Sequence, residues 1–225
     1  MKNGVLILSC TLFFLGIGFA TEREQLEKTA TQGDATAQIS LGFRYYNGDG
    51  VPKDKAKAVE WFRKAADQGM AGAQMMLGEM YATGAGVPKD NVKASEWYRK
   101  AAEQGDAGAQ SNLGFMYAKG AGVPKDATKA VEWIRKAAVR RDAGAQFNLG
   151  VMYSEGECVA KDEIEGLAWF NIAAAAGGAQ AVKNRGIAEA RVGRDGTLEA
   201  QRRSREILKE IEAAKAARAS IKGSQ

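Results

Sequence analysis

Histidine is absent from this 225-residue chain, and cysteine (2 residues) and proline (3 residues) are scarce. The absence of histidine removes the commonest general base and the commonest metal ligand of proteins. The motifs GxSxG, SxxK, CxxC and GxxxxGK(S/T) do not occur either, so the usual nucleophile, redox and phosphate-binding signatures are missing. We therefore predict a protein that is not an enzyme, with no catalytic residue, no metal site and no cofactor.

A clustered excess of one charge is missing as well. The formal net charge is +5, from 32 basic and 27 acidic residues that are interspersed along the chain. A nucleic-acid-binding protein shows a concentrated basic stripe instead. We therefore expect no nucleic-acid partner, and we interpret the charges as solvated helix surface.

Residues 1–20 have the pattern of a secretory signal. Lys2 precedes a mostly apolar run that ends at Phe19, and small residues flank this position as in a cleavage site. We expect cleavage near Ala20, export to the bacterial periplasm or the medium, and no stable membrane insertion afterwards. The alternative is an uncleaved inner-membrane anchor, because the apolar run approaches the ~17 residues that can span a bilayer.

Cleavage would leave a single cysteine in the mature chain. Cys10 lies inside the apolar run, so only Cys158 would remain. No intrachain disulfide could then form, and the chain has no histidine to activate the thiol. We interpret Cys158 as an incidental loop residue, which leaves packing alone to hold the fold together.

What the sequence does contain is a regular repeat. Four residue types recur in phase, in four copies that are 36 residues apart. They are the tryptophans Trp61, Trp97, Trp133 and Trp169, the tyrosines Tyr45, Tyr81, Tyr117 and Tyr153, the leucines of four Leu-Gly pairs (Leu41, Leu77, Leu113, Leu149) and the alanines of four Ala-Gln pairs (Ala37, Ala73, Ala109, Ala145). Such a period indicates an array of stacked structural units.

Each copy reads as two helices joined by a loop. In the second copy, Ala73, Leu77 and Tyr81 are spaced by four residues, which places them on one helical face. Residues 84–90 (GAGVPKD) follow as a loop, because glycine and proline interrupt a helix. A second apolar face around Trp97 then predicts the second helix. One such hairpin cannot bury its apolar face alone, whereas stacked copies can.

Single residues in the copy predict how these helices begin, end and pack. Asp90 is placed to cap the second helix, and Gly105 to end it in a left-handed conformation. Gly78 allows a neighbouring helix to approach closely. The bulk of Trp97 and Tyr81 is expected to fill the space between the helices.

The pattern AQxxLGxxY…GxGVPKD…KAxxWxxKAAxxG resembles the Sel1-like repeat family, which is related to the tetratricopeptide repeats. The resemblance covers residues 35–182 and implies an all-α fold, a right-handed α-solenoid of four helix-turn-helix repeats. The fourth copy departs from the pattern, since Ala160 replaces the proline and Cys158 lies in its loop.

The segments on either side of the repeats are expected to close the stack. Residues 28–38 align with the end of a second helix and the following turn, so residues 21–34 predict an N-terminal capping half-repeat. Residues 183–225 predict C-terminal capping helices and a tail, with a turn at Asp195-Gly196. The alternative for this basic amphipathic segment is contact with a membrane or a partner.

The resemblance also indicates where a partner would bind. In related tetratricopeptide arrays, the first-helix positions that point away from the packing face line a concave groove that binds peptides. The matching residues here are Ile39, Phe43, Tyr46, Met75, Glu79, Ser111, Phe115, Phe147 and Val151. Most are large and apolar, as in an interaction surface.

We therefore predict an exported, non-enzymatic scaffold or adaptor that holds another protein, such as an envelope protein. The first alternative is a periplasmic immunity protein that neutralises a secreted toxin effector, a role that the family resemblance implies for some exported members. The remote alternative is a weak hydrolase of β-lactamase type. Described members of that kind carry a cysteine pair in each repeat, which this chain lacks.

Overall fold

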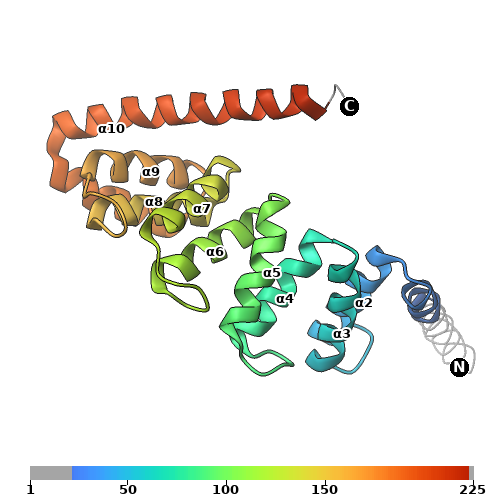
Figure 1. Cartoon of the computed structure of the whole chain (residues 1–225). Helices are drawn as coiled ribbons and strands as arrows, with labels where there is room; N and C mark the ends of the chain where they lie inside the picture. Colours follow the sequence, from blue (N-terminus) through green and yellow to red (C-terminus); the bar gives the residue numbers. More distant parts are fainter. Residues whose placement is uncertain (1–21, 223–225) are drawn as a thin grey trace, which may run out of the picture. The chain divides into compact units, whose positions relative to one another are not determined.

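The computed structural model describes residues 22–222, and all regular structure within them is α-helical (Figure 1). The predicted all-α fold is confirmed. The predicted signal, residues 1–20, lies outside the described residues. The chain divides into two compact units, Met1–Lys100 and Ala101–Gln225, and each unit is considered by itself below.

Each repeat contributes a first and a second helix, and the eight helices α2 to α9 have 13 residues each. A helix over residues 22–31 comes before them. The labelled helices are α2 (Ala35–Asn47), α3 (Lys55–Asp67), α4 (Ala71–Thr83), α5 (Asn91–Glu103), α6 (Ala107–Lys119), α7 (Ala127–Val139), α8 (Ala143–Glu155), α9 (Glu163–Ala175) and α10 (Ala179–Lys222). None of the helices within residues 22–222 is both long and apolar enough to cross a membrane.

Aspartates fix where most helices begin. The predicted cap Asp90 accepts a hydrogen bond from the backbone N–H of Lys93 at 3.1 Å. Its pKa is lowered, chiefly by this backbone hydrogen bond, because the bond favours the charged carboxylate. The predicted left-handed Gly105 has φ +92°. Side chains of the same kind cap the first helices α2, α6 and α8, namely Asp34, Asp106 and Asp142.

The first helix of the second repeat lacks such a cap. Met70 occupies the position of these aspartates and makes no side-chain hydrogen bond to α4. We expect Met70→Asp to raise the free energy of unfolding by about 1 kcal/mol, because a carboxylate would satisfy an unpaired N–H and favour the positive helix end. Urea titration checks this. Met70→Ala is the control, and equal stability of the two variants would contradict the prediction.

The close approach of helices occurs at the glycine of each Leu-Gly pair. A Cβ on Gly78 would lie 2.5 Å from Cδ1 of Tyr98, so the expected role of Gly78 is confirmed. The residue that fills this space was not expected. It is the one directly after the tryptophan, and it takes the same place in each repeat: Phe62, Tyr98, Ile134 and Phe170.

The prediction that the repeat tryptophans fill the interior is wrong for the first three copies. Trp61, Trp97 and Trp133 are only partly buried. A lysine three residues later lies over each ring, 4.0, 4.0 and 4.1 Å from the ring centre. The reason is geometric, since a residue one position later points about 100° further round the helix. Only Trp169 is fully enclosed, at 1% exposure.

The glutamine of each Ala-Gln pair joins a first helix to the preceding second helix. Its side-chain amide donates to the backbone carbonyl eight residues earlier, at 3.0 to 3.1 Å in all four repeats. In the first repeat Gln68 also donates to Oε1 of Gln38, at 2.8 Å. Arg140 and Ala176 replace Gln68 in the last two repeats. The Oε1 atoms left there without a hydrogen-bond partner in the described chain belong to Gln110 and Gln146.

The C-terminal helix α10 is bent back on itself in the second unit (Figure 1). Its one non-helical residue is Gly193, with φ +71° and ψ −171°. The expected turn at Asp195-Gly196 is therefore wrong by two to three residues. Gly196 is instead required for close packing, because a Cβ there would lie 2.6 Å from Cβ of Val192.

Candidate protein-binding surfaces

The predicted groove residues of the first unit are mostly part of its interior. Ile39, Tyr46 and Met75 are partly buried and pack against the cluster around Phe62 and Leu77. Phe43 on α2 is different, because 39% of its surface is exposed. Its ring meets that of Phe62 edge-on, with 5.1 Å between the ring centres. This contact holds the exposed Phe43 ring in place.

Glu79, the acidic member of the predicted set, is half-buried on α4. Burial, and to a smaller extent the negative charge of Glu79, raise the pKa of the Tyr98 hydroxyl above its ordinary value. Glu79 therefore acts electrostatically on the residue that packs against Gly78. Glu79 is thus neither fully exposed nor fully buried, and its contact with a partner stays a prediction.

In the second unit, Ser111 and Phe115 on α6 have opposite environments. Ser111 is buried, so the structure does not present it at the surface as the sequence suggested. Its neighbours on the helix show why, because Gln110 and Leu113 are also buried and extend the packed face to Ser111. Phe115 is 41% exposed. Only Phe115 of this pair is available at the surface.

Phe147 and Val151 on α8 pack inside the second unit. They contact a cluster that contains Leu167 and Phe170 of α9, and the rings of Phe147 and Phe170 are 5.7 Å apart. Ala188, in the first part of α10, belongs to the same cluster. These two predicted groove residues therefore hold α8, α9 and α10 together. The first part of α10 packs against the last repeat, although the repeat pattern of the sequence has ended there.

What remains of the predicted set is one exposed phenylalanine in each unit. Phe43 and Phe115 occupy the same repeat position on α2 and α6. Each is a large apolar side chain on a rigid helix, the kind of group that anchors a protein partner. The described residues contain no group of three His, Cys, Asp or Glu side chains that could hold a metal ion.

The exposed apolar residues of α10 were not anticipated from the sequence. Val182 and Ile187 precede the bend, and Leu198 and Leu208 follow it, with exposed fractions from 38% to 56%. Helical periodicity over residues 179–222 does not predict their exposure. The bend at Gly193 changes which residues of α10 face α9. The sequence feature that could have identified these four residues is the presence of an apolar side chain on a helix face otherwise occupied by Arg, Lys and Glu.

Comparison with known sequences places this architecture in a family. Residues 35–70, 71–106, 107–138 and 143–178 each match the Sel1 repeat. The chain belongs to the Sel1 repeat family. Proteins of this family are generally non-enzymatic scaffolds that bind other proteins.

Solved Sel1 repeat structures have the same fold. The crystal structure of c5321, a protective antigen of uropathogenic Escherichia coli, matches with a TM-score of 0.69 and 39% identity over 71% of this chain and 34% of c5321. A Sel1 repeat protein from Oxalobacter formigenes matches with a TM-score of 0.67 and 34% identity over 77% of this chain and 72% of the other.

A curated relative is the secretory immunoglobulin A-binding protein EsiB of Escherichia coli O6:H1. It is 41% identical over 67 residues, which are 28% of this Sel1 repeat chain and 14% of EsiB. The chain thus spans a small part of EsiB and about a third of c5321.

Proposed function

We propose that this Sel1 repeat protein is an exported, non-catalytic scaffold that binds another protein through exposed phenylalanines on the first helices of its repeats. The observation that carries the proposal is the exposure of Phe43 and Phe115, at 39% and 41%, at the same repeat position of a family of protein-binding scaffolds. Export is supported by the signal-like residues 1–20, and a bacterial setting is supported by the origin of the relatives.

A partner segment that suits either site has an apolar side chain to place on the phenylalanine ring of that site. Leaving about 40% of a phenylalanine exposed forgoes part of its burial free energy, and a partner that covers the ring recovers it. An amphipathic helix or an extended segment can supply such a side chain. A toxin would be one possible source of that segment, and the immunity role stays a prediction.

The proposal is tested by substituting each phenylalanine separately. Residues 21–225 are used to capture proteins from an envelope extract, and the captured protein is purified and titrated against Phe43→Glu and Phe115→Glu. We expect each substitution to weaken binding at least about tenfold, as at interface anchor residues, because a charge replaces an apolar contact. The measurement is the dissociation constant, with helix content checked by circular dichroism.

Each unit offers a matched control in an apolar residue elsewhere that is more exposed than the phenylalanine. Val92→Glu serves for the first unit and Val182→Glu for the second, since these residues are 55% and 46% exposed. They carry the same added charge without touching the proposed sites. The proposal is refuted if the control variants weaken binding as much as the phenylalanine variants, or if no variant changes it.

A further inference from the structure

The bend in α10 depends on a conformation that other residues avoid. Gly193 has φ +71° and ψ −171°, a region of backbone space that is essentially restricted to glycine. The chain is helical on both sides of it, over residues 179–192 and 194–222. Any residue with a Cβ at position 193 would therefore favour one continuous helix over the folded-back arrangement.

A second glycine favours the bend for an independent reason. In the folded-back chain, a Cβ on Gly196 would lie 2.6 Å from Cβ of Val192 and 3.0 Å from Cδ1 of Ile164. In a continuous helix, the Cβ atoms of residues four apart are about 5–6 Å apart. An alanine at Gly196 thus clashes only when α10 is bent. A larger residue is therefore unfavourable at both positions in the bent form only, at Gly193 because of its dihedral angles and at Gly196 because of its contacts.

The outer face of α9 is specialised to receive the segment 194–222. In the first three repeats this face carries Lys, Glu and Lys at three fixed positions, as in Lys57, Glu60 and Lys64. In α9 the corresponding residues are Glu165, Ala168 and Ile172. Ala168 and Ile172 are buried, so the face has lost its solvated charges where α10 lies along α9 (Figure 1).

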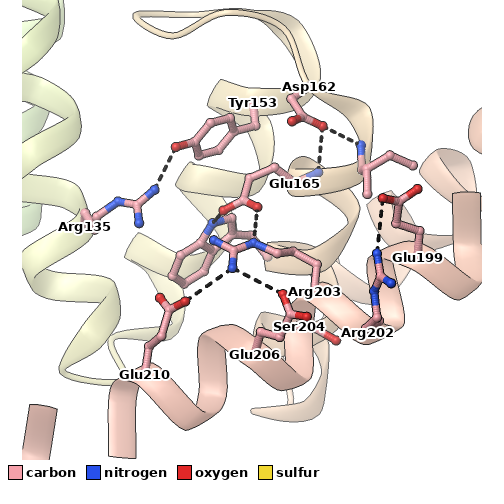
Figure 2. Close-up of polar contacts among 12 residues, drawn as sticks. Arg135, Tyr153, Asp162, Glu165, Glu199, Arg202, Arg203, Ser204, Glu206 and Glu210 are labelled. Atoms are coloured by element: carbon pink, nitrogen blue, oxygen red, sulfur yellow. Dashed lines mark hydrogen bonds and ion pairs between the residues drawn. The ribbon is translucent and has the colours of Figure 1, made fainter. Parts of the chain in front are cut away.

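The segment carries the matching groups. Nε of Arg203 lies 2.7 Å from Oε2 of Glu165, whose other oxygen accepts a hydrogen bond from Nε1 of Trp169. Figure 2 shows Arg203 between Glu165 and the acidic side chains of its own helix. Ile207 and Ile211 are 2% exposed. The contact therefore joins an apolar stripe to one partly buried ion pair.

We propose that residues 194–222 are an exchangeable segment, which docks on α9 of a second copy of this chain when α10 straightens at Gly193. Straightening would produce a helix of 44 residues, about 66 Å long. It would also uncover Ala168 and Ile172 on α9 and the isoleucines of the segment. A second copy opened in the same way presents the same two surfaces, and mutual exchange covers both. The two glycines keep the chain in the bent, monomeric form.

The first test removes the glycines. We expect Gly193→Ala, Gly196→Ala and above all the double variant to form dimers, seen as a doubled mass by light scattering after size exclusion. Gly186→Ala is the matched control, because Gly186 lies in the helical part of α10 with nothing within 4 Å of an added Cβ. It improves helix propensity equally and should stay monomeric. A folded, monomeric double variant would overturn the proposal.

The second test leaves both glycines in place and reverses the ion pair. Glu165→Arg and Arg203→Glu each put like charges together within one chain. When the two variants are mixed, partly unfolded and refolded together, both ion pairs are restored only by exchange between copies. We expect a heterodimer, detected with two different tags, and a monomer for the Glu165→Arg/Arg203→Glu double variant. A mixture that yields only monomers, or no preference for the heterodimer over either homodimer, would contradict exchange. Neither test involves Phe43 or Phe115, so each outcome is independent of the proposed scaffold function.

Discussion

Replacing Gly150 with valine should lower the free energy of unfolding by about 3 kcal/mol, near the upper end for overpacked cores. A Cβ at this position would lie 2.5 Å from both Cδ1 and Cε1 of Phe170. The ring cannot move away easily, because Phe170 is 3% exposed and belongs to the cluster with Leu167 and Ala188. Valine would therefore separate α8 from α9. Urea titration followed by circular dichroism measures the loss.

Two further variants identify the cause of this loss. Gly186→Val makes the same change at a helical glycine with open space around it, so it should alter stability by well under half as much. In the second variant Phe170→Ala is combined with Gly150→Val, and the combined loss should be less than the sum of the single losses, because removing the ring removes the clash. Simple additivity would show that the contact between Gly150 and Phe170 is not responsible.

These glycines illustrate how far the sequence predicts this fold. The period of 36 residues, the cap at Asp90 and the close approach at Gly78 all depend on local patterns, and the structure contains them. The partner of Gly78 is not local, because Tyr98 lies on the next helix. Sequence reasoning assigned the filling role to the more conspicuous tryptophan, one position before it.

The candidate binding residues were predicted less completely than the fold. Helical periodicity correctly placed Phe43 and Phe115 away from the main packing face, and both are exposed. It does not reveal which neighbours cover a residue from outside its own helix. Phe147 is covered in this way by α9 and the first part of α10. The exposure of such a position depends on which later segment packs over it, and here α9 and α10 pack over Phe147.

The bend of α10 was misplaced for a related reason. Asp-Gly is a common turn signal, whereas the glycine that bends the chain is Gly193, which has no turn-forming neighbour in sequence. A better signal was present in α9. The change from lysine and glutamate to Ile172 and Ala168 on its outer face indicates that another segment covers this face.

Trp169 lies on α9, next to the face that this segment covers. We expect Trp169→Ala to lower the free energy of unfolding by about 3–5 kcal/mol, the usual loss for a large aromatic residue in a core. Trp169 is 1% exposed, and its Nε1 donates to Glu165 at 3.1 Å. Its removal leaves a cavity inside the second unit and takes a hydrogen bond from the carboxylate that pairs with Arg203.

The control is the tryptophan at the same position of the preceding repeat. Trp133 is only partly buried, and Lys136 lies 4.1 Å above its ring. Trp133→Ala should cost less than about 2 kcal/mol, because it forfeits partial burial and one exposed cation–π contact. Urea titration of both variants gives the comparison. Equal losses would mean that α10 does not protect Trp169 in solution, since the two residues differ mainly in what covers them.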